Sequence, residues 1–92
     1  MTSKAQVIQK LFKDASNEVH NLQSKPSDND LLELYANYKQ ATVGDINIDK
    51  PSFYMFKDVS KWTAWDKLKG TSKVQAQVNY IKIVEDLKNK YN

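Results

Sequence analysis

Hydrophobic side chains recur every three or four residues in the first part of the chain, as they do on one face of an amphipathic helix. The recurring positions are Ile8, Phe12, Ala15, Val19 and Leu22. This pattern predicts a helix from about Lys4 to Leu22. The segment Ser24-Lys25-Pro26-Ser27 ends it, because proline and small polar residues interrupt helices.

A second helix is predicted from about Asp28 to Thr42, with Leu31, Leu34 or Tyr35, and Tyr38 on its apolar face. We expect Asp28 to cap its N-terminus, where carboxylates also favour the positive end of the helix dipole. Gly44 suits the position after the C-terminus, because glycine adopts a left-handed backbone without steric cost.

The segment from Gly44 to Lys57 is the one long irregular stretch. Its Asp, Asn and Pro residues favour turns, and its large apolar side chains lead us to expect that it is pinned to the core. A short third helix is predicted from about Val59 to Lys69, with Gly70 stopping it. Its apolar positions are Trp62, Trp65 and Leu68.

The last helix is predicted from about Ser72 to Tyr91, because Ser72-Lys-Val-Gln75 has the pattern of a capping box. Lys88 and Lys90 suit the negative end of its dipole. Its apolar stripe consists of Ala76, Tyr80, Ile83 or Val84, Leu87 and Tyr91. Four helices in a chain of 92 residues predict an all-α fold in one domain, residues 1–92.

The composition limits both the chemistry and the compartment. The chain has 14 lysines, no arginine, 11 acidic residues and a formal net charge of +3, a mild excess that favours an anionic partner. The absence of cysteine excludes disulfides, thiolate zinc sites and a cysteine nucleophile. Since the sequence has neither a signal-peptide core nor a run of 18 apolar residues, we expect a cytoplasmic protein.

No arrangement of residues favours catalysis. Histidine is the side chain best suited to proton transfer near neutral pH, and the one histidine, His20, fits a solvated position on a helix. The nearest carboxylate pairs, Asp28 with Asp30 and Glu85 with Asp86, fit capping and solubility. No set of His, Asp or Glu has the spacing of metal ligands, and no glycine-rich phosphate loop occurs. We expect no enzymatic activity, metal or cofactor.

Tyr35, Tyr38 and Lys39 lie on one helical face, because three and four residues separate them. Tyrosine rings can stack on a base, and an ammonium group suits a phosphate, so the three side chains fit a nucleotide. The spacing fits equally well two tyrosines directed to the core beside a solvated lysine.

Lys57 and Lys61 are four residues apart and would project together beside Trp62 and Trp65. A solvated lysine face explains the pair as well. We expect the two tryptophans in the core, because a domain this small needs large buried side chains.

Together these segments resemble the acyl-CoA-binding protein family. The run Tyr35-x-x-Tyr38-Lys39-Gln40-Ala41-Thr42-Val43-Gly44-Asp45 matches the family signature nearly letter for letter. Further matches are Lys61-Trp62-x-Ala64-Trp65 and Leu68-Lys69-Gly70, with Ala76 and Tyr80 at the expected spacing downstream. The similarity extends from roughly Ile8 to Tyr91.

The resemblance implies a four-helix bundle with one long crossover loop that binds medium-chain and long-chain acyl-CoA thioesters without catalysis. The adenosine 3′-phosphate would be held by Tyr35, Lys39 and Lys61. Tyr38 would line the adenine region, Lys57 would be a neighbouring phosphate contact, and Tyr80 would contribute a contact from the last helix. The acyl chain would lie in a groove between the first helices, lined by Phe12, Leu31 and Leu32. Acyl-CoA-using enzymes and membranes would be transient partners of a monomer.

The sequence departs from the family pattern in three regions. His20 stands where a lysine is common, so we count it as a candidate head-group contact that depends on pH. Ser16 and Ser60 stand where alanine is expected beside the acyl groove, which would alter chain-length preference. Ser52-Phe53-Tyr54-Met55-Phe56 replaces the small residue usual after Pro51 and makes the loop bulkier.

Two other functions fit parts of the sequence. Lysines interleaved with tyrosine and tryptophan also occur in nucleic-acid-binding domains, but the absence of arginine and the many acidic residues argue against one. A membrane-surface or partner-docking helix would need a basic face, and Glu85 and Asp86 interrupt the lysines of the last helix. We therefore favour the carrier and expect no nucleic-acid partner.

Overall fold

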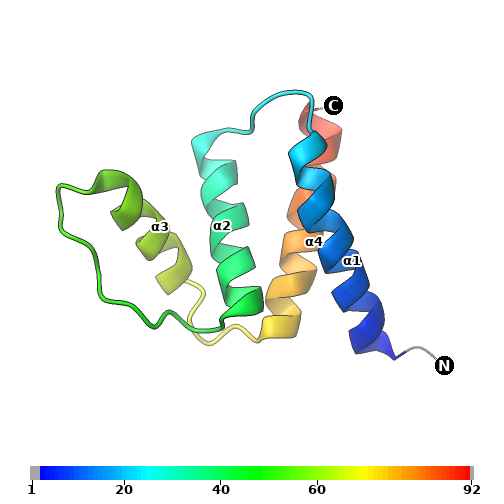
Figure 1. The fold of residues 1–92 in the computed structure, drawn as a ribbon, viewed down its shortest axis with the longest axis horizontal. Helices are drawn as coiled ribbons and strands as arrows, with labels where there is room; N and C mark the ends of the chain where they lie inside the picture. Colours follow the sequence, from blue (N-terminus) through cyan, green and yellow to red (C-terminus); the bar gives the residue numbers. More distant parts are fainter. Residues whose placement is uncertain (1–2, 92) are drawn as a thin grey trace.

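The computed structural model describes residues 3–91, which form four α-helices and one short 3₁₀ turn (Figure 1). The helices are α1 (Lys4–Glu18), α2 (Asp28–Thr42), α3 (Phe56–Asp66) and α4 (Lys73–Tyr91), and the 3₁₀ turn η1 (Val19–Asn21) follows α1. The predicted all-α fold is confirmed. None of the helices in this range is both long and apolar enough to cross a bilayer.

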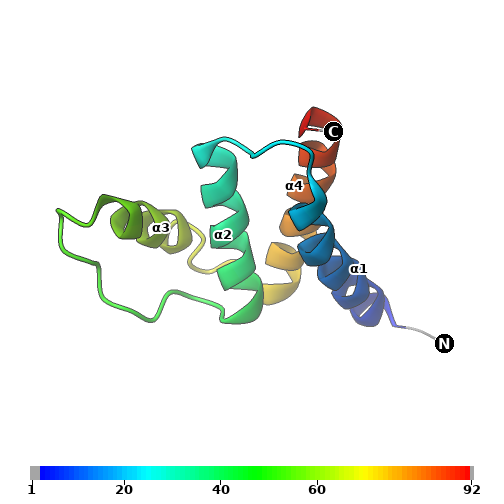
Figure 2. The same cartoon turned by 45° about the horizontal axis from the view of Figure 1, so that its top comes forward.

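The helices lie side by side in the order α3, α2, α4, α1, an arrangement that persists when the molecule is turned (Figure 2). α1 and α4 run in one direction and α2 and α3 in the other (Figure 1). Since α2 and α3 are consecutive and parallel, the segment between them must return along the length of the bundle. This segment is the predicted crossover loop.

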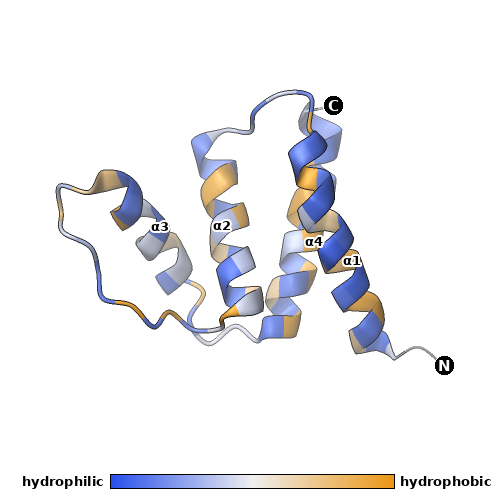
Figure 3. Ribbon diagram, in the orientation of Figure 1, coloured by the Kyte–Doolittle hydropathy of each residue, from blue (hydrophilic) through white to orange (hydrophobic). Residues whose placement is uncertain are grey.

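The core lies around α4, between α1 and α2. Its buried residues are Ala15, Leu34, Tyr80, Val84 and Leu87. Val84 is fully buried while Ile83 is partly exposed, which decides between the two alternatives for the apolar stripe of α4. Along α1, hydrophobic residues recur among hydrophilic ones (Figure 3), and Phe12, Val19 and Leu22 pack against the core as their spacing predicted.

The predicted ends of the helices are correct for α2 and close for α1 and α4. α2 is capped by Ser27 and not by Asp28: the Ser27 hydroxyl accepts the Asp30 N–H at 3.2 Å, while Asp28 lies inside the first turn. The first helix, predicted to end near Leu22, ends at Glu18, and the 3₁₀ turn η1 takes the place of its last predicted turn. At α4, the Ser72 hydroxyl accepts the Gln75 N–H at 3.0 Å, as a capping serine does.

α3 begins and ends three residues earlier than the sequence predicted. It begins early because the Val59 N–H donates a hydrogen bond to the Met55 carbonyl. The positive end of the helix dipole also stabilises the carboxylate of Asp58 in the first turn. It ends at Asp66 because the residues that follow form 3₁₀-type hydrogen bonds between positions three apart. One of these runs from the Leu68 N–H to the Trp65 carbonyl at 3.0 Å. After this turn, the Gly70 N–H donates a hydrogen bond to the Asp45 carboxylate.

The crossover loop is held in its first half by a bond to its backbone, and the expectation that its apolar side chains anchor it is wrong, because Ile48 and residues 53–56 are exposed. Trp62 Nε1 donates to the Ile48 carbonyl at 2.8 Å and holds the first half against α3. The side chains of Phe53, Tyr54 and Met55 are exposed. They come after Pro51 and lie where no neighbouring helix covers them.

Candidate functional site

A network of polar side chains fixes the end of α2 against the start of α4. The amide of Gln40, which is fully buried, donates to Asp45 Oδ1 at 2.9 Å and to the Thr71 carbonyl at 2.8 Å. The same carboxylate oxygen accepts the Gly70 N–H at 2.8 Å. These bonds, with the nearby charge of Lys69, hold the pKa of Asp45 below its usual value. Gln40 and Asp45 therefore build the frame of the site.

Trp65 connects the same end of α2 to α3. Its indole is 2% exposed, and its Nε1 donates to the Gly44 carbonyl at 2.9 Å, so its predicted place in the core is confirmed. Gly44 has φ +97, the left-handed backbone predicted for the position after α2. The Lys39 Nζ lies 5.5 Å from the centre of the Trp65 ring system, within the range of a cation–π contact.

The first pocket lies between the C-terminal part of α1 with η1 and the facing side of α2, over α4. It has a volume of about 520 Å³. Its lining joins aromatic and polar side chains and includes Ser16, His20, Leu31, Tyr35, Tyr38 and Tyr80. The predicted site residues His20, Tyr35, Tyr38 and Tyr80 are thus brought together from three segments of the chain.

Three aromatic rings meet at the first pocket, and two of them, Tyr38 and Tyr80, belong to its lining. Phe12 stacks on Tyr38 with ring centres 5.7 Å apart and meets Tyr80 edge-on at 5.1 Å. Tyr38 keeps 44% of its surface exposed, so it is not the core-facing residue that helical spacing also allowed. Burial raises the pKa of Tyr80, and the neighbouring Tyr38 adds to the effect. Like any tyrosine at neutral pH, the Tyr80 phenol can donate a hydrogen bond.

The second pocket lies between the N-terminal half of α2 and α3 and has a volume of about 340 Å³. Leucines form one wall, and lysines stand at its edge. The lining residues are Lys25, Asp28, Leu31, Leu32, Tyr35, Phe56, Lys57, Ser60 and Lys61. Because Leu31 and Tyr35 line both pockets, the two cavities adjoin across these side chains.

Tyr35 and Lys61 meet where the two pockets adjoin. The Lys61 Nζ lies 5.5 Å from the centre of the Tyr35 ring. Lys39 follows Tyr35 by one helical turn and lies on the same side of α2, over Trp65. The interface between α2 and α3 thus has the ammonium groups of Lys39 and Lys61, each beside an aromatic ring. Lys57 lies one turn before Lys61 and also lines the second pocket. This concentration of positive charge suits an anionic ligand.

The three residues expected in the acyl groove lie in different surroundings. Leu31 lines both pockets, Leu32 lines the second, and Phe12 packs against the rings of Tyr38 and Tyr80 at the first. Sequence reasoning missed Lys25 and Phe56 as lining residues. Lys25 precedes Pro26 in the break between two helices, and Phe56 belongs to the aromatic run after Pro51, so both stood at breaks in the pattern that could have drawn attention to them.

The described residues, 3–91, hold no group of three or more His, Asp or Glu side chains that could bind a metal ion. The chemistry available at the two pockets is hydrogen bonding from phenols, charge from lysines, ring stacking and burial of apolar surface. These interactions bind and orient a ligand.

Comparisons with known proteins agree on one family. A family model described as acyl CoA binding protein matches residues 9–84. The chain is 46% identical over 86 residues to the acyl-CoA-binding protein of Saccharomyces cerevisiae, covering 94% of this chain and 99% of that protein. It is 48% identical over 80 residues to acyl-CoA-binding protein homolog 1 of Caenorhabditis elegans, covering 87% of this chain and 93% of that protein.

Solved structures give the same result for the fold. The crystal structure of Oryza sativa acyl-CoA-binding protein 2 superposes with a TM-score of 0.85 at 36% identity, over 90% of this chain and 92% of that one. The solution structure of the acyl coenzyme A binding protein from yeast superposes with a TM-score of 0.72 at 48% identity, over 90% and 96%.

Proposed function

The chain belongs to the acyl-CoA-binding protein family, and we propose that it binds one medium-chain or long-chain acyl-CoA thioester across its two adjoining pockets. The family consists of binding proteins and not of enzymes. We further propose that residues 1–92 act as one acyl-CoA-binding domain of a monomeric, cytoplasmic carrier.

The observation that supports this proposal is the contact of two chemically different pockets across Leu31 and Tyr35. The first has phenols and a histidine, which suit a base and its ribose. The second has leucines edged by lysines, which suit a hydrocarbon chain attached to phosphates. An acyl-CoA has a nucleotide at one end and an alkyl chain at the other, so it would use both pockets.

Each end of the ligand has candidate contacts. We propose that the adenine lies in the first pocket against Tyr38 and Tyr80, with the 3′-phosphate near Tyr35, Lys39 and Lys61. His20, in the lining of the first pocket, and Lys57, in that of the second, would be additional head-group contacts. The acyl chain would lie in the second pocket along Leu31 and Leu32, and Phe12 would support the adenine side by holding Tyr38.

The energetics favour the thioester over its parts. Each buried methylene contributes about 0.8 kcal/mol, so a long chain supplies most of the binding free energy. A lysine hydrogen-bonded to a phosphate adds about 1–3 kcal/mol and discriminates in favour of the CoA head group. Free fatty acid lacks the phosphates and free CoA lacks the chain. Both should therefore bind much more weakly than the complete ligand.

A carrier of this kind lowers the free concentration of acyl-CoA and shields the thioester from water. It would release its ligand to acyl-CoA-using enzymes and membranes, which are transient partners. Sequestration needs tight binding and no chemical step.

Calorimetric titration of the purified chain with palmitoyl-CoA tests the proposal, with free CoA and palmitate as controls. We expect saturable heat at about one ligand per chain for palmitoyl-CoA, and far weaker binding of both controls. A series of thioesters from eight to twenty carbons should show affinity rising with chain length until the second pocket is filled. The absence of saturable palmitoyl-CoA binding would refute the function.

A further inference from the structure

Four consecutive large side chains stand exposed where the crossover loop meets α3. Phe53 is 84% exposed, Tyr54 67% and Phe56 74%, and Met55 lies between them, also exposed. We call residues 53–56 the aromatic tip. We propose that the aromatic tip inserts into the interfacial layer of a phosphatidylcholine bilayer and docks the protein there. The proposal deepens the carrier function, but the docking itself needs no acyl-CoA.

The aromatic tip is a formed structure on the outer edge of the molecule. The Met55 N–H bonds to the Ser52 carbonyl at 2.9 Å, and the rings of Phe53 and Tyr54 meet edge-on with centres 5.7 Å apart. α3 packs against α2 and, within residues 3–91, makes no comparable contact with α1 or α4. The loop therefore runs along the side of α3 that faces away from the bundle (Figure 1).

The residue types of the aromatic tip suit the boundary between lipid and water. Tyrosine has an apolar ring and a polar hydroxyl, which is why it is enriched at the level of the lipid head groups. Phenylalanine and methionine gain free energy when their exposed surface leaves water. Lys50 and Lys57 flank the tip on the two sides in the sequence and can reach the phosphates with their ammonium groups.

The charged residues around the aromatic tip do not by themselves favour binding to a membrane. Asp49 and Asp58 accompany Lys50 and Lys57, so the segment around the tip is balanced in charge. We therefore expect apolar insertion to dominate. Docking should occur on zwitterionic lipid, with only a modest gain from anionic lipid and a weak dependence on salt.

A second copy of the chain fits the aromatic tip less well. A stable protein interface covers about 800 Å² on each partner with complementary shape. Four side chains on a loop offer on the order of 500 Å² of exposed surface. A bilayer requires no matching shape, and a few exposed aromatic rings can enter it. The exposed area therefore favours lipid.

The aromatic tip lies beside the second pocket, so docking by the tip would bring this pocket to the membrane surface. Phe56 and Lys57 belong to the lining of that pocket, and Phe56 is also part of the tip. A protein docked by its tip would hold the edge of the pocket against the lipid. On the proposed function, an acyl chain could then pass between the pocket and the bilayer with little exposure to water.

Co-sedimentation of the ligand-free chain with phosphatidylcholine vesicles tests the docking. The double variant Phe53→Gln/Tyr54→Gln removes two tip rings that line neither pocket. We expect it to lower the partition coefficient about tenfold or more. The matched control Val7→Gln/Leu11→Gln removes two exposed apolar side chains from α1, far from the tip, and should leave partitioning unchanged.

Three outcomes would overturn the docking. The native chain could fail to pellet with vesicles above the vesicle-free blank. Both double variants could lose binding equally. Sedimentation equilibrium without lipid could reveal a dimer that the tip variant abolishes, which would assign the surface to a second copy. Circular dichroism verifies folding of each variant. Palmitoyl-CoA titration of the tip variant separates the two proposals, because docking can fail while ligand binding persists.

Discussion

The phenol of Tyr91, at the end of α4, donates a hydrogen bond to the carboxylate of Asp30 in the first turn of α2, with 2.8 Å between the Tyr91 oxygen and Oδ2. The same phenol oxygen accepts the Ser27 N–H at 3.0 Å. The last residue of α4 thereby holds the first turn of α2, from which Leu31 and Leu32 reach the second pocket. This contact joins the stability of the fold to the geometry of the site.

The substitution Tyr91→Phe should lower thermal stability by a few degrees, because it removes the donor to Asp30 and leaves the Ser27 N–H without its partner. Thermal unfolding followed by circular dichroism measures the effect. Tyr54→Phe serves as a control, since it removes a hydroxyl from an exposed ring. Equal melting temperatures for Tyr91→Phe and the native chain would contradict the role assigned to this bond.

Acid should destabilise the protein through Asp30 and Asp45. The Tyr91 hydroxyl, the Ser27 hydroxyl and Lys90 lower the pKa of Asp30, and the Gly70 N–H, Gln40 and Lys69 lower that of Asp45. A carboxylate with a lowered folded-state pKa binds protons more weakly when the chain is folded. Its stabilisation is complete above the unfolded pKa of about 3.9 and is lost as pH falls through the lower folded value.

Urea unfolding from pH 7 to pH 3 measures this loss. The midpoint should stay nearly constant for these two groups down to about pH 5 and then fall. The variants Asp30→Asn and Asp45→Asn should be less stable at pH 7 and should each show a shallower fall in acid. A variant that keeps the full native acid dependence would show that the corresponding carboxylate is not responsible.

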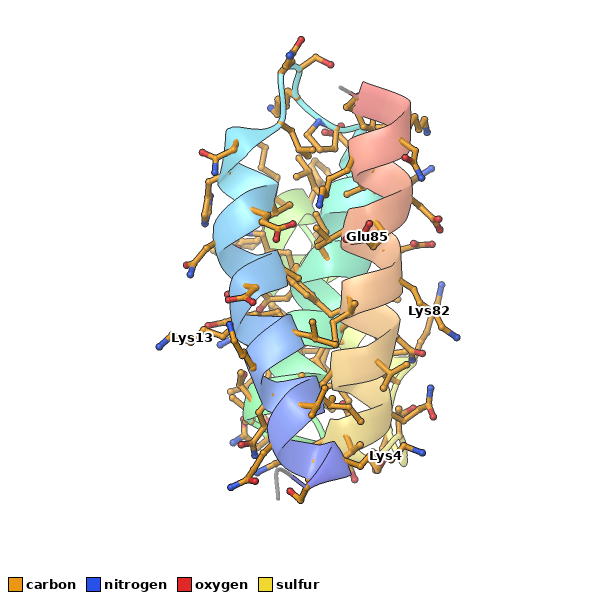
Figure 4. The ribbon with its side chains drawn as sticks, turned by 90° about the vertical axis from the view of Figure 1, so that its right-hand side faces the viewer. Lys4, Lys13, Lys82 and Glu85 are labelled. Carbon is orange, nitrogen blue, oxygen red and sulfur yellow. The ribbon has the colours of Figure 1, made fainter. Side chains whose placement is uncertain are left out.

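Lys61→Gln should weaken palmitoyl-CoA binding by about 1–3 kcal/mol, because it removes an ammonium group proposed to contact the 3′-phosphate. Thermal stability should hardly change, since Lys61 is exposed. Lys13→Gln is the matched control: Lys13 projects outward from α1 (Figure 4) and lines neither pocket. If Lys61→Gln unfolds the protein but leaves the affinity of the folded fraction intact, Lys61 is structural.

Trp65→Ala should have the opposite effect, a loss of about 3–5 kcal/mol in the free energy of unfolding, because it empties the volume of a buried indole. Trp65→Phe keeps an apolar ring and removes the Nε1 donor to the Gly44 carbonyl, so its loss should be smaller. Urea unfolding measures both. A stable Trp65→Ala variant that no longer binds palmitoyl-CoA would move Trp65 from the core to the binding site.

α2 and α3 show how far local patterns determine helix ends. Both ends of α2 were predicted, because Pro26 with Ser27 lies before it and Gly44 after it, and these residues act within their own segment. α3 was misplaced by three residues at each end. The turn that follows its C-terminal end is held by a bond from the Gly70 N–H to Asp45, 25 positions away in the sequence. Helical periodicity carries no information about such a partner.

The candidate site was also only partly predictable. The spacing of Tyr35, Tyr38 and Lys39 indicated a common face but left open whether it meets solvent or core. The structure resolves this by the position of α1 and α4: Phe12 and Tyr80 pack against one side of Tyr38 and leave the rest of its ring exposed. The roles of Gln40 and Asp45 as frame residues required the fold, since their bonds reach Thr71 and Gly70.

The amino-acid sequence by itself determined the four helices, the crossover between the second and third, and the family, because periodicity, caps, breaks and signature residues are local properties. Only the tertiary structure decided that two pockets adjoin across Leu31 and Tyr35, that Phe12 packs against the rings of Tyr38 and Tyr80, and that residues 53–56 stay uncovered. The physical reason is that burial is a property of packed surfaces, and a helix acquires its neighbours only when the whole chain has folded.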